Sequence, residues 1–119
     1  MNIIFANRED AAEMTARYIL LELDTFRIND EVKISWCVLD PATVPMTELW
    51  QVDTLRGLHA KLLESYQTQN WKNAAGYLEQ LVGKWACQVD SYYAIMKKRL
   101  EDLTQYDMPD WTHVIDKQP

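Results

Sequence analysis

The feature that most constrains the fold of this chain is a continuous apolar stripe between Asn70 and Ala86. Apolar side chains recur there every three or four residues, the spacing that places them on one face of an α-helix. They are Trp71, Ala74, Ala75, Leu78, Leu81, Val82 and Trp85. Asn70 directly precedes the stripe and can cap its first turn. The pattern predicts a central helix over residues 70–86 whose stripe packs against the helices before and after it.

A change to period-two alternation nearer the N-terminus predicts a β-hairpin. Odd positions are apolar between Tyr18 and Arg27, and even positions are apolar between Val32 and Val38. The pair Asn29-Asp30 lies between them and tolerates positive φ, so it can form a two-residue loop. Such a loop places Leu21 opposite Val38, Leu23 opposite Trp36, and Thr25 opposite Ile34. All these side chains then share one face, and Cys37 lies on the other, wet face opposite Glu22.

The flanking segments complete the predicted fold. A short buried strand is expected over Asn2–Ala6, and a short helix over Arg8–Arg17 with Asn7 as its N-cap. After the hairpin, Pro45 and Thr47 mark the start of a helix that runs to about Gln69. A third helix begins at Asp90 or Ser91, where the apolar spacing resumes.

The expected class is α+β: an N-terminal β-hairpin, which the first strand can join, packed on three antiparallel α-helices. Short connections between the helices predict antiparallel neighbours. We expect a single domain over residues 1–119, with a strand-rich part at 1–40, a three-helix part at 46–105 and an ordered tail at 106–119.

Charge and composition exclude several functional classes. Eighteen acidic and twelve basic residues give a net charge of −6, which disfavours nucleic acid as a partner. The longest run of hydrophobic residues, Tyr92–Met96, is far shorter than the roughly 20 needed to cross a bilayer, so no membrane partner is expected. Cys37 and Cys87 fit neither a disulfide framework nor a C-x-x-C motif. These features predict a cytoplasmic protein with two reduced thiols.

The three glycines, Gly57, Gly76 and Gly83, all lie inside predicted helices, where each costs about 1 kcal/mol relative to alanine. Gly76 and Gly83 lie on nearly the same face, beside Tyr77, and can open a second close contact or a groove. Tight packing by another element is favoured there over a ligand site, because no phosphate-binding glycine motif accompanies them. His59 lies on the apolar side of its helix and is interpreted as a core-edge histidine.

No residue pattern predicts catalysis, a cofactor or a metal. His113 lies among three acids that can bind a divalent cation, but their spacing fits no established motif and a solvated acidic tail is favoured. The acids are Asp107, Asp110 and Asp116. Both cysteines are interpreted as small apolar fillers. Glu22 and Asp24 are interpreted as ordinary strand alternation rather than a catalytic carboxylate pair.

The aromatic residues supply the functional hypothesis. Five Trp and six Tyr exceed what one small core needs, and these residues favour association surfaces. Burial of all of them within one chain is an equally open reading. The candidate interaction face consists of Trp50, Gly76, Tyr77, Gln80, Gly83 and Tyr92. We expect a non-enzymatic interaction protein that binds a protein partner or a second copy of itself. The alternative is a small ligand-binding protein or enzyme with a pocket between hairpin and helices near Gly76, Tyr77 and His59.

Two resemblances accompany these patterns. Y-Q-T-Q-N-W-K-N-A-A-G-Y-L (Tyr66–Leu78) and P-D-W-T-H-V-I-D-K (Pro109–Lys117) resemble a tetratricopeptide-like helix pair of the kind found in adenylate cyclase C-terminal tails. Only one unit is present, whereas a solenoid needs about three. Y-I-L-L-E-L-D-T-F (Tyr18–Phe26) and L-V-G-K-W-A-C-Q-V-D-S-Y-Y (Leu81–Tyr93), with the hairpin return around Trp36, resemble a family of small uncharacterised proteins of T4-like marine phages. That resemblance implies no activity, only a source in viral or marine metagenomic sequence. If the chain is viral, the hypothesis becomes an accessory protein that binds a host or phage protein in the host cytoplasm.

Overall fold

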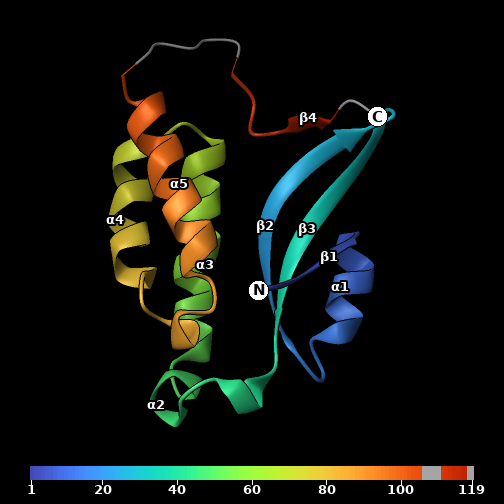
Figure 1. Cartoon of the computed structure of the whole chain (residues 1–119), viewed down its shortest axis with the longest axis vertical. Coiled ribbons are helices and arrows are strands. Elements are labelled where there is room, and N and C mark those ends of the chain that lie inside the picture. The colour runs from blue at the N-terminus through green and yellow to red at the C-terminus, as the bar shows by residue number, and fades with distance from the viewer. Residues whose placement is uncertain (106–110, 118–119) are drawn as a thin grey trace. The chain divides into compact units, whose positions relative to one another are not determined.

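The computed structural model describes residues 1–105 and 111–117, which divide into two compact units (Figure 1). The first unit contains residues 1–44 and the stretch from Thr112 onward, and it holds the β-sheet. The second unit, Pro45–Trp111, is helical. The predicted α+β class is confirmed. The single domain over residues 1–119 stays a prediction, and each unit is described by itself.

Four strands form the sheet of the first unit in the order β1-β3-β2-β4. They are β1 (Asn2–Ala6), β2 (Ile19–Ile28), β3 (Glu31–Leu39) and β4 (Ile115–Lys117). β3 is antiparallel to β1 and β2, whereas β4 is parallel to β2. β1 has the predicted bounds but is not the buried strand that we expected, because it lies at the edge of the sheet. Its Ile3 and Phe5 side chains are 48% and 57% exposed.

The last strand comes from the predicted ordered tail. Phe26 pairs with Ile115 and Ile28 with Lys117, so the tail returns to the sheet of the first unit. Arg27 and Asp116 form an exposed ion pair with 3.4 Å between Nη1 and Oδ1. Residues 106–110 and 118–119, which the tail prediction also covered, lie outside the described residues.

The hairpin turns at Asn29-Asp30, as the sequence predicts. Their φ values are 52° and 65°, the left-handed conformation that a two-residue hairpin loop of type I′ requires. The register beside the turn also agrees with the prediction, because Thr25 pairs with Ile34. The turn chemistry therefore identifies both the loop and the first cross-strand pairs.

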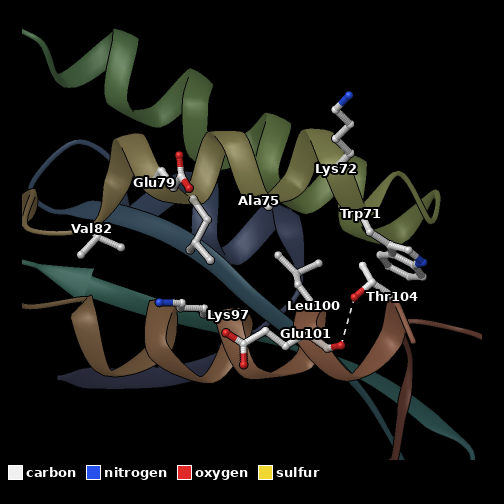
Figure 2. Close-up of a pocket in the computed structure, with 10 residues that line it drawn as sticks. Trp71, Lys72, Ala75, Glu79, Val82, Lys97, Leu100, Glu101 and Thr104 are labelled. Atoms are coloured by element: carbon white, nitrogen blue, oxygen red, sulfur yellow. Dashed lines mark hydrogen bonds between the residues drawn. The ribbon is translucent and has the colours of Figure 1, made fainter. Parts of the chain in front are cut away.

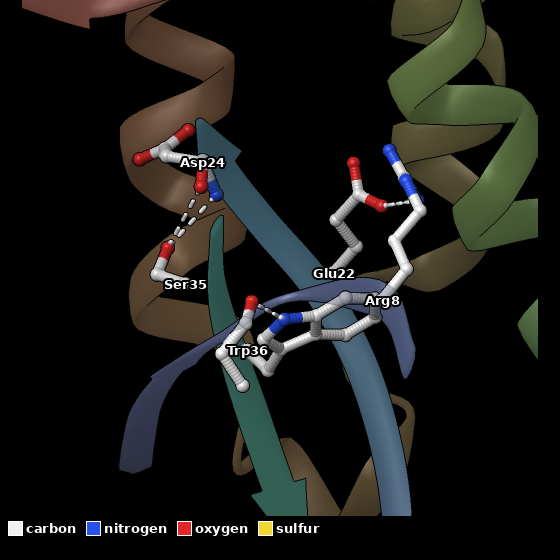
Figure 3. A network of polar contacts seen from close by, with 6 residues as sticks. Arg8, Glu22, Asp24, Ser35 and Trp36 are labelled. Atoms are coloured by element: carbon white, nitrogen blue, oxygen red, sulfur yellow. Dashed lines mark hydrogen bonds and ion pairs between the residues drawn. The ribbon is translucent and has the colours of Figure 1, made fainter. Parts of the chain in front are cut away.

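Beyond Thr25 the predicted register is wrong, because β2 contains a β-bulge between Glu22 and Thr25. Leu23 and Asp24 lie opposite the single residue Ser35, so every later pair is shifted by one position. The observed pairs are Glu22 with Trp36, Leu21 with Cys37, and Leu20 with Val38. The Ser35 hydroxyl provides hydrogen-bond partners for the backbone of Asp24 within the bulge. Its Oγ accepts from the Asp24 backbone N–H at 3.0 Å and donates to the Asp24 carbonyl oxygen at 3.2 Å (Figure 3).

The bulge changes which side chains of β3 are buried. Cys37 was expected on the wet face opposite Glu22, but it pairs with Leu21 and is fully buried. Trp36 takes the place opposite Glu22 and is only partly buried. A one-residue shift has this effect because successive strand side chains point to opposite faces.

The connection from β1 to β2 contains α1 (Arg8–Met14), which ends three residues before the predicted Arg17. Asn7 is its N-cap, as predicted, and its Oδ1 accepts from the Asp10 backbone N–H at 2.8 Å. Two contacts join the hairpin to this connection and to the end of β1 (Figure 3). The Arg8 guanidinium pairs with the Glu22 carboxylate, and Trp36 Nε1 donates to the Ala6 carbonyl oxygen at 2.9 Å.

The second unit contains the predicted helices with different boundaries. A short 3₁₀ helix, η1 (Pro41–Thr43), lies at the end of the N-terminal stretch of the first unit, just before the second unit begins. The first long helix is interrupted at Trp50 and Gln51, which separates α2 (Met46–Leu49) from α3 (Val52–Gln67). The following elements are α4 (Trp71–Leu81), the short η2 (Trp85–Cys87) and α5 (Asp90–Leu103). α4 packs against both α3 and α5 (Figure 1).

The central helix is shorter than predicted, because it ends at Leu81 rather than Ala86. Gly83 follows with φ +85°, and its N–H donates to the Asp90 carboxylate at 2.9 Å. Trp85, Ala86 and Cys87 also have positive φ, between 53° and 61°. The Ala86 N–H donates to the Glu48 carboxylate at 3.1 Å. A left-handed turn therefore replaces the last predicted helical turn, and Trp85 enters the core from it.

The glycines do not mark the close helix contact that we expected. Gly57 and Gly76 lie within α3 and α4, but a Cβ added at either position would meet nothing within 4 Å. Gly83 lies outside the helix, in a conformation that side chains other than glycine rarely adopt. Only Gly83 thus has a conformational need for glycine.

Candidate functional site

The candidate site is a groove between α4 and α5, called here the α4–α5 groove (Figure 2). Its volume is about 530 Å³, and it is lined by Trp71, Lys72, Ala75, Leu78, Glu79, Val82, Lys97, Leu100, Glu101 and Thr104. Leu78 and Leu100 are buried and form its apolar floor, whereas Ala75 and Val82 are exposed along its α4 wall. Val82 is 52% exposed, so apolar surface is open to solvent here.

The spacing of the lining residues explains why both helices present a continuous wall. On α4 the apolar lining residues follow one another at intervals of four, three and four: Trp71, Ala75, Leu78 and Val82. On α5 the intervals are three and four: Lys97, Leu100 and Thr104. This is the a/d spacing by which helices pack side by side in bundles. Trp71 and Thr104 lie at one end of the groove and Val82 and Lys97 at the other, so the two helices are antiparallel (Figure 2).

Four exposed charged side chains form the rim of the groove: Lys72 and Glu79 on α4, and Lys97 and Glu101 on α5. Their order along the groove is opposite on the two helices. From the Trp71 end, α4 carries first the cation and then the anion, whereas α5 carries first the anion and then the cation (Figure 2). None of the four forms an ion pair with any residue in the described ranges 1–105 and 111–117. The rim is electrically balanced and its charges are available to an occupant.

An aromatic cluster forms one end of the groove. The Trp71 ring contacts Tyr66 and Trp111, with ring centroids 6.1 Å and 5.1 Å away. Tyr66 and Trp111 meet edge to face, with centroids 5.1 Å apart. Because it packs against two other aromatic rings, the Trp71 ring is held in place as a wall at this end of the groove.

Among the described residues, the lining of the groove presents few polar groups that could recognise a small molecule specifically. The Thr104 hydroxyl donates to the Glu101 carbonyl oxygen at 3.0 Å, so it is already engaged (Figure 2). The other polar groups of the described lining are the indole N–H of Trp71 and the four charged side chains on the rim. Small-molecule sites usually combine an apolar lining with a few polar groups that converge on the ligand.

The six residues of the predicted interaction face do not line this groove. Trp50 is 84% exposed, between α2 and α3. Gly76 and Gln80 are exposed on α4, where Gln80 Nε2 donates to the Gly76 carbonyl oxygen at 3.3 Å; Tyr77 between them is partly buried. Gly83 is exposed beyond the helix end. Tyr92 is only 3% exposed and packs beside His59, with ring centroids 6.4 Å apart.

The groove instead uses part of the predicted apolar stripe. Ala74 and Leu81 are buried, whereas Trp71, Ala75 and Val82 lie along the groove. The helices that pack on α4 therefore cover only part of the apolar stripe. Sequence reasoning missed the lining residues of α5, above all Lys97 and Glu101. The pattern that could have identified this wall is the spacing of three and four residues around the buried Leu100.

The other residues singled out in the sequence either lie in the core or do not join a group of metal-binding side chains. His59 is 2% exposed and its Nδ1 lies 3.1 Å from the Tyr93 hydroxyl, so it lies within the core rather than at its edge as expected. Among the residues that the structure describes, no three His, Cys, Asp or Glu side chains come together to hold a metal. Asp107 and Asp110 of the predicted acidic tail lie outside those residues.

The two thiols differ in their surroundings. Burial raises the pKa of the Cys37 thiol to about 11, so this thiol stays protonated at neutral pH. Cys87 is exposed, and the nearby Asp90 carboxylate is the main cause that raises its thiol pKa above 9.0. Neither environment favours the thiolate that nucleophilic catalysis needs.

Comparison with protein-family models, with curated protein sequences and with solved structures finds no match to this chain. The two resemblances drawn from sequence motifs therefore stay predictions. In the described ranges, no helix is both long and apolar enough to cross a membrane.

Proposed function

We propose that this chain is a non-enzymatic protein-interaction module and that its α4–α5 groove receives an apolar segment of a protein. The observation that carries the proposal is the combination of an open apolar groove with four rim charges that are unpaired within the described residues. Protein interfaces have this organisation, with an apolar centre surrounded by a polar rim.

The chemistry of the groove favours a protein segment over a small ligand. Its floor is made of the aliphatic side chains of Leu78 and Leu100, and its one hydroxyl, on Thr104, is engaged by the main chain. A helix needs no convergent buried polar group in the groove, because its backbone hydrogen bonds are satisfied internally and its side chains can contact the charged rim.

Site-specific photocrosslinking tests the proposal. A benzoylphenylalanine at Val82, on the edge of the groove, should form crosslinks to protein in cells that express the chain. The same probe at Gln80, which is exposed on α4 but outside the groove, is the matched control and should crosslink several-fold less. Adding Ala75→Arg to the Val82 probe should abolish the crosslinks, because the long charged side chain fills the groove.

Circular dichroism of the Ala75→Arg variant checks that it folds, which is expected because Ala75 is exposed. Equal crosslinking from Val82 and Gln80, or crosslinks that persist in the presence of Ala75→Arg, would contradict the proposal.

A further inference from the structure

We propose that the segment received by the α4–α5 groove belongs to a second copy of this chain, so that α4 and α5 of two copies form a four-helix bundle. This inference rests on the proposed function and identifies its partner. The observation behind it is the opposite order of charges on the two walls: Lys72 then Glu79 on α4, and Glu101 then Lys97 on α5 (Figure 2).

That order makes the groove complementary to itself. A two-fold axis along the groove turns one copy over and lays its α4 on the α5 of the other. Lys72 of one copy then faces Glu101 of the other, and Glu79 faces Lys97. Each contact occurs twice by symmetry, so all four rim charges of each copy gain a partner of opposite sign.

A two-fold axis across the groove leads to the same result. It lays α4 on α4 in the reverse direction, so that Lys72 faces Glu79 of the other copy, and Lys97 faces Glu101 on α5. Both symmetric ways of joining the two faces are thus electrostatically favourable. Opposite charges on a rim mainly select the partner and the orientation of an interface.

A partner of uniform charge fits this rim less well. A basic segment laid in the groove would meet two cations, Lys72 and Lys97, for every two anions, and an acidic segment would meet the same balance. Its attractions and repulsions would cancel. A second copy carries the required alternation without any further assumption.

The apolar part of the groove has the pattern of a bundle core. In a four-helix bundle, two pairs of antiparallel helices face each other, and side chains at a/d spacing fill the space between the pairs. Trp71, Ala75, Leu78 and Val82 on α4 have this spacing, as Leu100 does with Thr104 on α5. A second copy would cover the exposed Ala75 and Val82 side chains.

The size of the surface sets the expected strength. α4 has 11 residues, so it is about 16 Å long, and two adjacent helices are about 20 Å wide. Their flat footprint is about 300 Å² per copy, which is less than the roughly 800 Å² per partner of a standard stable interface. We therefore expect a reversible dimer with a dissociation constant in the micromolar range or weaker.

Sedimentation velocity of the purified full chain between about 1 μM and 1 mM measures this association. The wild type should change from monomer to dimer over that range. Two charge variants, Lys72→Glu with Lys97→Glu and Glu79→Lys with Glu101→Lys, should each weaken self-association at least about tenfold, because every rim contact becomes a like-charge contact. An equimolar mixture of the two variants should restore the dimer, because an all-acidic rim then meets an all-basic one.

The matched control is Lys33→Glu with Lys61→Glu, which changes the net charge by the same amount at exposed positions outside the groove. It should dimerise as the wild type does. Restoration in the mixture also shows that both charge variants are folded. A wild type that stays monomeric at the highest concentration, or a mixture that does not associate, would overturn the proposal.

The outcome is separable from that of the proposed function. If the Val82 probe crosslinks only to other proteins while the purified chain stays monomeric, the second copy is refuted and the interaction groove stands. If the probe crosslinks to nothing, both proposals fail.

Discussion

Adding one methyl group at two glycines of the second unit should change stability in opposite directions. Gly76 lies inside α4, and a Cβ there meets nothing within 4 Å, so Gly76→Ala removes the helical cost of glycine without a clash. The gain should be about 1 kcal/mol. Gly83 has φ +85°, and an alanine in a left-handed conformation costs about 1–2 kcal/mol. The two variants should therefore differ by about 2–3 kcal/mol in the free energy of unfolding.

Urea denaturation followed by tryptophan fluorescence and circular dichroism measures both changes. For 119 residues, 1 kcal/mol corresponds to about 4 °C in melting temperature. Gly76→Ala should thus melt about 4 °C higher and Gly83→Ala about 4–8 °C lower than the wild type. Gly57→Ala, in the open interior of α3, is the matched control and should also be stabilising.

A decrease in stability for Gly76→Ala, with an increase for Gly57→Ala, would refute the reasoning for α4. It would mean that another part of the protein, or a second copy, packs closely on the Gly76 face, as the sequence suggested. An unchanged or higher melting temperature for Gly83→Ala would show that α4 continues past Leu81.

Four further outcomes are expected. Ser35→Ala should destabilise the first unit by about 1–3 kcal/mol, measured by urea denaturation, because both backbone groups of Asp24 lose the hydroxyl; no change would mean that water replaces it. Ala86→Gly should stabilise by about 1 kcal/mol in thermal melts, because Ala86 is exposed and its φ is 53°. In alkylation with iodoacetamide followed by mass spectrometry, Cys87 should react in the folded protein and Cys37 only after unfolding, because Cys37 is fully buried. The Cys37 pKa is raised from 9.0 to about 11 by folding, so its contribution to stability should be complete below pH 9 and decline as the pH rises towards 11.

The hairpin shows how far the sequence predicts the sheet. Asn29-Asp30 identifies the loop because few residue pairs tolerate positive φ at both positions. The bulge escapes prediction because alternation on each strand is still regular, and only the pairing between the strands shifts. The run Ile19-Leu20-Leu21, apolar at three successive positions, does indicate burial on both sheet faces at that end of β2, but it does not locate the bulge.

The central helix shows a second limit. The apolar spacing continues through Val82 to Trp85, although the helix ends at Leu81. Periodicity reports which side chains seek burial and not the backbone path that takes them there. Gly83 was the better guide, because glycine just beyond a helix end commonly adopts a left-handed conformation.

The groove was only partly accessible to sequence reasoning. The stripe correctly identifies the buried face of α4 through Ala74, Leu78 and Leu81. The width of the stripe does not predict how much of it the neighbouring helices cover. The covered fraction depends on where α5 packs against α4. The charge order of Lys97 and Glu101 against α4 likewise becomes meaningful only once the two helices are known to be antiparallel neighbours.

The parallel pairing of β4 with β2 has a consequence for the newly made chain. Arg27 and Asp116, which lie on these two strands, are 89 positions apart, and the whole second unit is encoded between them. At the usual rate of about 5–20 residues per second, a ribosome needs about 5–20 s to synthesise that interval. During this time one edge of β2 has no strand beside it, although the local contacts of the helices can already form. Translation speed through the helical unit thus sets how long this nascent edge is open to pairing with other chains.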